Sequence, residues 1–170
     1  MTISEILLED FDAEVSNTRR TLERLPEDKP DWAPHEKSMK LGKLAMHCAT
    51  ITLFGYYILT DDGMDLANSK HDQSDLTFTT VANALAQLDA NAAKCRAAIA
   101  AASDEDLTKD WKFSFGEHLI SHYSRSKSFR IMCFDHMIHH TSQLGVYLRL
   151  LNIPVPVLYG PSADEQWAPK

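Results

Sequence analysis

Apolar residues recur at helical spacing along four long stretches of the chain. The stretches cover residues 3–25, 41–60, 79–102 and 125–152. Recurrence at steps of three and four places apolar side chains on one face of a helix, with polar residues on the other. Pro26 follows the first stretch and Pro154 the last, and proline cannot continue a helix. We therefore predict an all-α chain, a four-helix bundle that forms one domain over residues 1–170.

The connection between the third and fourth stretches is long for a bundle. Residues 103–124 form it, and Trp111, Phe113 and Phe115 alternate there with polar residues. This alternation allows a short extended segment, but no stretch predicts a convincing sheet. Residues 64–76 are polar and lack a period, so we expect a loop there. A connection as long as 103–124 is often functional or covers an opening in the core.

Composition changes the picture mainly by excluding partners. The 170 residues include 17 Lys and Arg against 24 Asp and Glu, a net charge of −7, so no cationic excess is available for a phosphate backbone or an anionic membrane. No apolar run approaches the ~18 residues that span a bilayer, and the N-terminus lacks a signal-peptide pattern. Cys48, Cys95 and Cys133 are far apart and do not indicate a disulfide framework. We expect a cytoplasmic protein with no nucleic-acid or membrane partner.

Histidines supply the strongest chemical signal. His136 and His140 lie four residues apart in the fourth stretch, so their imidazoles stand on one helix face, one turn apart. His47 falls on the apolar stripe of the second stretch, where an unpaired ring nitrogen is costly. Imidazole nitrogens coordinate divalent ions at ~2.0–2.1 Å, and one ion would pair all three rings at once. His47, His136 and His140 are therefore the predicted metal ligands.

Simpler interpretations of these residues stay open. A lone histidine on an apolar stripe is more often a hydrogen-bonded core residue, and a pair four residues apart is common by chance. The known zinc-peptidase motifs do not fit, because they require glutamate where Met137 or His139 stands. The helix therefore carries no general-base carboxylate of that kind, and peptidase chemistry is disfavoured.

Five neighbouring residues have several possible roles. His139 could support a ligand from behind, lie on the helix surface or substitute as a ligand. Asp135 points about a hundred degrees away from the pair and is a weaker candidate for such support. Cys133 could be a soft ligand or a reactive thiol, but a small buried apolar residue is the preferred interpretation. His118 and His122 lie in the long connection, either above the site or, as we prefer, in solvent.

The order and spacing of these residues resemble a known family. The segments that carry the resemblance are LGKLAMH at 41–47, DHMIHH at 135–140, QL at 143–144, YLR at 147–149, IPVP at 153–156 and YGPS at 159–162. Together they are similar to the DinB family, the DinB/YfiT-like metalloenzymes. The likeness covers nearly the whole chain in order and spacing, and the combination with His47 is more specific than the last helix alone.

The resemblance carries its own expectations about fold, cofactor and activity. It implies a four-helix bundle that often dimerises and holds a divalent metal, commonly zinc or nickel, on three histidines. These histidines map onto His47, His136 and His140. Some relatives resemble thiol-dependent transferases that use a low-molecular-weight thiol such as bacillithiol or mycothiol.

Two classes of function stay open at this point. A three-histidine site leaves coordination positions free, as catalytic sites do, so the first is a metal-dependent enzyme. It would be a low-molecular-weight-thiol S-transferase or a hydrolase of small substrates. The alternative is a non-catalytic metal or small-ligand binding protein of a stress response. Apolar residues on the second and fourth stretches exceed one stripe, so we also expect a homodimer.

Overall fold

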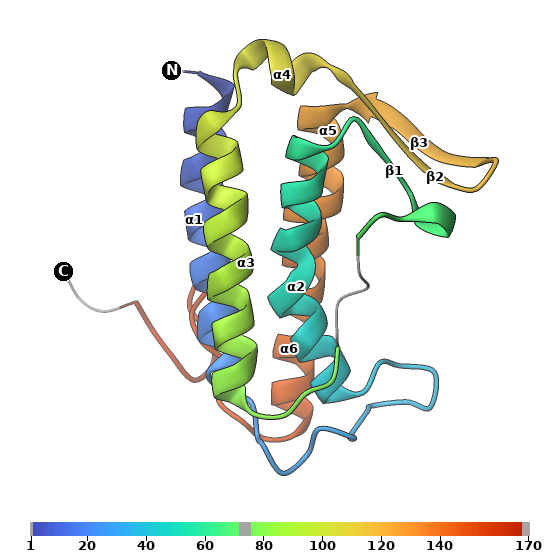
Figure 1. The fold of residues 1–170 in the computed structure, drawn as a ribbon. Helices are drawn as coiled ribbons and strands as arrows, with labels where there is room; N and C mark the ends of the chain where they lie inside the picture. The colour runs from blue at the N-terminus through green and yellow to red at the C-terminus, as the bar shows by residue number, and fades with distance from the viewer. Residues whose placement is uncertain (1, 72–75, 168–170) are drawn as a thin grey trace.

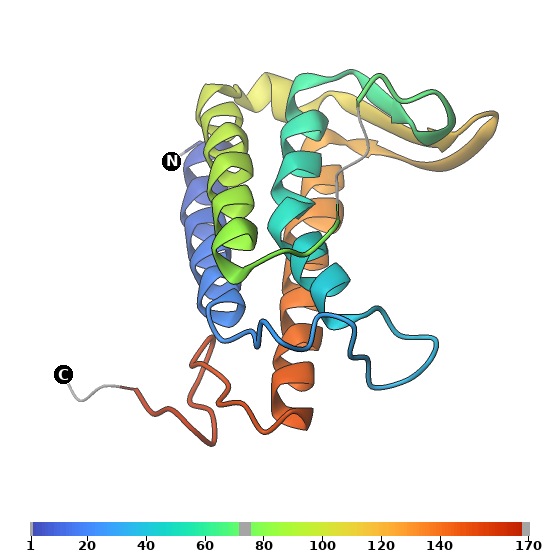
Figure 2. The same ribbon diagram turned by 60° about the horizontal axis from the view of Figure 1, so that its bottom comes forward.

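The computed structural model describes residues 2–71 and 76–167, and long helices lie side by side in it with a small sheet at one end (Figure 1). The helices are α1 (Ile3–Leu22), α2 (Leu41–Thr60), α3 (Val81–Ala101) and a last segment made of α5 (Arg125–Phe129), the π-helix η2 (Arg130–Asp135) and α6 (His136–Leu150). Turning the molecule shows the connection between α1 and α2 and the C-terminal tail at the end away from the sheet (Figure 2). The predicted helix-bundle packing is confirmed.

The helices begin where the sequence supplies caps. The Thr2 side chain accepts a hydrogen bond from the Glu5 backbone, and the Glu5 side chain accepts one from the Thr2 backbone. Thr80 caps α3 through the backbone N–H of Asn83. Such caps satisfy backbone donors that have no partner within the helix. Local sequence therefore fixes these helix starts.

A three-stranded sheet corrects the all-α expectation. Its strands are β1 (Gly63–Asp65), β2 (Asp110–Phe115) and β3 (His118–Ser124), in the order β1-β2-β3. The pairing of β1 with β2 is parallel, and that of β2 with β3 is antiparallel. The alternation at Trp111 and Phe113 was the local signal for β2, whose Trp111 is fully buried. The hairpin turn places Gly116 at φ +57°, a conformation that glycine adopts without strain.

Two predicted connections therefore contain regular structure. Residues 103–124 include the short helix α4 (Asp104–Thr108) as well as the hairpin. Residues 64–76 were expected to form a loop, but β1 continues there into the 3₁₀ helix η1 (Leu66–Asn68). Residues 72–75 of that loop lie outside the described residues. The side chain of Asp65 accepts a hydrogen bond from the Gly116 backbone at 2.7 Å, which ties β1 to the hairpin turn.

The fourth predicted helix has the expected extent but is not uniform. Residues 130–135 form a π-helix between α5 and α6, where a continuous α-helix was predicted. A π-turn contains more residues than an α-turn, so the residues before it are rotated relative to those after it. Phe129, at the end of α5, and Cys133, within the π-helix, are both fully buried in the core. Single π-turns of this kind occur frequently at functional sites.

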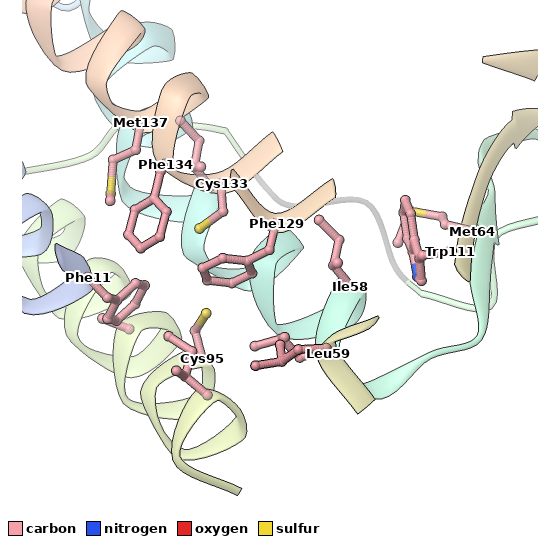
Figure 3. Packing of buried hydrophobic residues seen from close by; sticks show 14 residues of the cluster. Phe11, Ile58, Leu59, Met64, Cys95, Trp111, Phe129, Cys133, Phe134 and Met137 are labelled. Carbon is pink, nitrogen blue, oxygen red and sulfur yellow. The ribbon is translucent and has the colours of Figure 1, made fainter. Parts of the chain in front are cut away.

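The buried apolar residues form two clusters along the bundle. The cluster nearer the sheet contains Phe11, Trp111, Phe129 and Phe134, and much of it is drawn in Figure 3. The cluster at the other end is formed mainly by leucines of α1, α2, α3 and α6. No helix in the described part of the chain combines the length and the apolar character that crossing a membrane requires. His47 lies on α2 within the stretch that contributes Leu44 and Cys48 to the second cluster, and Ile51 of the first cluster follows one turn later.

Candidate metal centre

Three histidines meet where α2 faces the start of α6. His47 comes from α2, His136 is the first residue of α6, and His140 follows one turn later. Each offers a ring nitrogen, and these three atoms lie within 4.8 Å of one another. The Nε2 atoms of His47 and His136 are 3.1 Å apart. The structure thus brings together the three residues that the sequence analysis selected.

The ring nitrogens are oriented by neighbouring groups. His140 Nδ1 lies 2.7 Å from Oε1 of Gln143, and an amide oxygen only accepts, so Nδ1 donates. The lone pair of His140 is therefore on Nε2. The ring of His136 is hydrogen-bonded to the backbone of Met132, one turn earlier. Metal-binding histidines are oriented in this way, with one nitrogen bonded to the protein and the other left for the ion.

The donor set suits a divalent ion. Tetrahedral coordination at ~2.0–2.1 Å per bond separates two nitrogens by about 3.3 Å, close to the 3.1 Å between His47 and His136. Without an ion, one of these two nitrogens donates a hydrogen bond to the other, and which one donates depends on the tautomer. With both lone pairs facing the gap, the two neutral imidazoles would repel each other, and a cation would relieve that repulsion. All three ligand nitrogens lie within 4.8 Å of one another, so the rings would close in slightly around one ion. Among the described residues, this is the group of His, Cys, Asp and Glu side chains that could share an ion.

Burial keeps the three imidazoles neutral. Loss of solvent lowers the pKa of His47 to about 4, with further lowering from His140, His136 and Lys43. Burial is also the main reason why the pKa values of His136 and His140 are lowered. A neutral imidazole carries the lone pair that a metal ion needs. At neutral pH the site is therefore ready to bind a cation without first releasing protons.

The lowered pKa of His47 predicts how the stability of the metal-free protein depends on pH. An unfolded histidine gains a proton near pH 6.5, but folded His47 stays neutral until about pH 4. Between these values the unfolded chain binds more protons, so the free energy of unfolding falls as the pH is lowered. Urea unfolding in the presence of a chelator at pH 7, 6 and 5 measures this. His47→Gln should reduce the slope, and equal slopes in both proteins would contradict the assignment.

The neighbouring candidates lie outside the cluster. His139 is exposed, with its ring centre 4.7 Å from that of His140, and it lies on the helix surface. Asp135 forms an ion pair with Arg130 at 2.9 Å, so it is committed elsewhere. His118 and His122 lie on β3, away from the three-histidine cluster. Of the three roles considered for His139, its position fits the helix surface.

The three cysteines are buried thiols. Figure 3 shows the side chains of Cys95 and Cys133 turned toward each other beside Phe129. The pKa of Cys95 is raised, first by its hydrogen bond with Cys133 and then by burial. Burial raises the pKa of Cys48 to about 12. None of the three is exposed, which agrees with the interpretation of Cys133 as a small buried residue.

A pocket adjoins the cluster, and the sequence analysis did not identify it. Its volume is about 500 Å³, which is within the range of small-molecule sites. His47 and His136 form part of its wall, together with apolar residues of α2 and η2. Phe113 and Leu66 close it from the sheet and η1, elements that the helical pattern did not predict. The histidine cluster is therefore open to a substrate-sized space.

Comparisons with known proteins agree with this architecture. Residues 10–144 match the sequence model of the DinB superfamily, a range that includes all three histidines. The crystal structure of a DinB-like protein from Bacillus cereus is similar, with a TM-score of 0.68 and 19% identity over 93% of this chain and 98% of that one. A DinB-like protein from Bacillus subtilis gives a TM-score of 0.67 and 17% identity over 89% and 95% of the two chains. No curated protein sequence matches the chain.

Proposed function

The chain belongs to the DinB superfamily, and on that basis we propose that it is a divalent-metal-dependent enzyme acting on a small molecule. His47, His136 and His140 would hold the ion. The observation that carries the proposal is their convergence at the wall of a pocket of about 500 Å³. A structural metal site is usually closed by four protein ligands, whereas three ligands beside a cavity leave room for a substrate.

Zinc or nickel is the proposed ion. Three imidazole donors suit both metals. When bound, the ion would supply Lewis-acid chemistry by lowering the pKa of a coordinated water or thiol. The residues of this chain do the rest: Gln143 and the Met132 backbone orient two rings, and the apolar pocket wall limits the access of water.

Transfer of a thiol is the reaction class that the site supports better than hydrolysis. Within the described residues, no carboxylate joins the histidine cluster, so no Asp or Glu is placed there to activate water. A thiol needs no such base once its pKa is lowered. In the proposed reaction the thiol loses its proton to solvent, and its sulfur forms a bond to an electrophilic carbon of the second substrate as the leaving group departs. A low-molecular-weight thiol is the proposed co-substrate.

The same lack of a carboxylate supports the second candidate function. A protein that binds a metal or small ligand in a stress response needs the three imidazoles and the pocket but no proton acceptor for catalysis. The two functions therefore share the site and differ in turnover. A measurement of turnover separates them, whereas a measurement of metal content does not.

The test is an activity screen of zinc- and nickel-loaded protein. Small thiols with a chlorinated aromatic acceptor would report transfer, and p-nitrophenyl esters would report hydrolysis. We expect thiol transfer that falls about 100-fold or more on chelation or in His136→Ala, since removing a ligand removes the reactive centre. His118→Ala is the matched control, because it removes an exposed histidine on β3. A stoichiometrically loaded protein with no turnover on any acceptor would support the binding function instead.

Architecture and assembly complete the proposal. We propose that the helices form a four-helix bundle within a single domain, and that two copies form a homodimer. Val146 and Leu150 support the dimer, because they are 58% and 54% exposed and lie one turn apart on α6. Light scattering over a dilution series would show the mass of two chains. The three free thiols support a reducing, cytoplasmic setting.

A further inference from the structure

The pocket beside the histidine cluster is elongated along α2. Its wall includes residues at helical spacing on that helix, from His47 through Ile51 and Phe54 to Tyr57. Ten residues of α-helix rise about 15 Å, so Tyr57 lies far along the pocket from the cluster. Only a ligand with an extended shape would contact both ends. The reacting group would lie at the His47 end, where the imidazole nitrogens converge.

The walls are mainly apolar between these ends. Phe54 packs edge-on against Phe113, with ring centres 5.6 Å apart, and Met64, Leu66 and Met132 add to the same wall. Among the described lining residues there is no Lys, Arg, Asp or Glu. A charged group placed here would lose its hydration without gaining a partner, which is costly. The middle of the pocket therefore favours an uncharged chain or ring.

A hydrogen-bonded histidine marks the far end. His71 stacks on Tyr57 with ring centres 3.6 Å apart, and its Nε2 lies 2.6 Å from a carboxylate oxygen of Asp61. Asp61 also accepts a hydrogen bond from Lys70 at 2.9 Å. His71 stacks on Tyr57, which is about 15 Å along α2 from His47. His71 therefore lies beside the tail of a ligand rather than beside the reacting atoms. The far end of the pocket is therefore more polar than its middle.

We propose that the pocket binds an uncharged, elongated and mainly apolar molecule, with its metal-binding head at the three histidines and its tail along α2 toward His71. This inference rests on the proposed function, because the cluster defines the reactive end. The inference also says which of the two substrates of a thiol transfer this pocket binds. Away from the proposed ion, a charged group of the thiol finds no cationic partner among the described lining residues, so the apolar part of this pocket accommodates the acceptor.

Three hydroxamic acids test the proposal on the cobalt-loaded protein. Acetohydroxamic acid carries the metal-binding head alone, hexanohydroxamic acid adds four carbons, and adipic acid monohydroxamate ends the six-carbon chain in a carboxylate. Each buried methylene strengthens binding several-fold, so we expect hexanohydroxamic acid to bind about 100-fold more tightly than acetohydroxamic acid. The carboxylate should remove this gain. Calorimetry measures the three affinities, and the visible spectrum of cobalt shows whether the ion is bound.

Two leucine variants locate the tail. Leu66 lines the pocket and is 44% exposed, so Leu66→Asp places a charge there without emptying the core. It should weaken hexanohydroxamic acid at least about tenfold and leave acetohydroxamic acid unchanged. Leu119→Asp is the matched control, because Leu119 is 54% exposed on β3 and does not line the pocket. Equal binding of the short and long acids to cobalt-loaded protein would overturn the inference.

A measurement without metal separates this inference from the metal assignment. Hexanamide at millimolar concentration should raise the melting temperature of the chelated protein, and adipamic acid, its carboxylate counterpart, should not. If the protein does not bind cobalt but hexanamide raises its melting temperature, the metal centre is refuted and the apolar pocket is supported. Cobalt binding without any advantage of the longer ligands would refute the pocket proposal and leave the metal centre standing.

Discussion

The purified protein is expected to carry close to one divalent ion per chain, and His136→Ala is expected to lose most of it. His136 is central because its Nε2 lies 3.1 Å from that of His47 and its ring centre lies 4.7 Å from that of His140. Removing one of three ligands leaves two, which is too few to hold an ion firmly. Elemental analysis after gel filtration measures the content of each protein. We expect a loss of at least about tenfold in affinity.

Two controls separate a lost ligand from a lost fold. The chelated wild-type protein should keep its helical circular dichroism, since the apolar clusters form without the ion. His139→Ala removes an exposed neighbouring imidazole and should keep the metal. Full occupancy in a variant with alanine at His47, His136 and His140 would refute the ligand assignment. Complete unfolding by a chelator would show that the site is structural rather than catalytic.

The helices and the histidine cluster are predictable because both follow from the helical period. His47 and His140 lie on faces that their helices turn toward one another, so the apolar pattern that locates the helices also locates the rings. The extent of α2 agrees with the predicted stretch, and the ends of the other helices differ by a few residues. The orientation of the His140 ring could not be predicted from the sequence, because it depends on the side-chain conformation in which Gln143 contacts the ring.

The sheet and the pocket depend on pairing between distant segments. Gly63 of β1 pairs with Lys112 of β2, and no local pattern over three residues of β1 indicates that partner. The pocket then requires Phe113 from β2 and Leu66 from η1 to lie opposite α2. The sequence also contains no signal for the π-helix, because residues 130–135 include no proline or glycine that would indicate an irregular turn. The residues that line the pocket were thus harder to predict from the sequence than those that would bind the ion.

Gly55→Ala is expected to destabilise the protein, although the same change in a helix usually stabilises it by about 1 kcal/mol. A Cβ on Gly55 would lie 2.7 Å from Sγ of Cys133, 2.9 Å from Cε2 of Phe129 and 3.1 Å from Sγ of Cys95. All three neighbours are fully buried, so they cannot move into solvent. Overpacking of this kind costs about 1–3 kcal/mol, which outweighs the gain in helix propensity. With the gain of about 1 kcal/mol subtracted, the net loss should be up to about 2 kcal/mol.

The position of Gly55 connects this packing to the candidate metal centre. Cys133 belongs to the π-helix that leads into His136, so a methyl group on Gly55 would push η2 away from α2. Metal affinity should therefore fall together with stability. Gly145→Ala is the matched control, because its Cβ would meet only Cγ1 of Val155, at the ordinary distance of 3.8 Å.

Chemical denaturation measures the loss of stability, and metal titration measures the loss of metal affinity. Both are applied to Gly55→Ala, Gly145→Ala and the double variant Gly55→Ala/Cys133→Ala. Gly145→Ala should gain up to about 1 kcal/mol and keep the metal affinity of the wild type. The double variant should recover part of the stability lost in Gly55→Ala, because the smaller side chain at Cys133 makes room for the new methyl group. A Gly55→Ala protein as stable as Gly145→Ala would show that α2 and η2 are less tightly packed than the structure has them. Unchanged metal affinity in a destabilised Gly55→Ala would show that His136 is positioned by α6 alone.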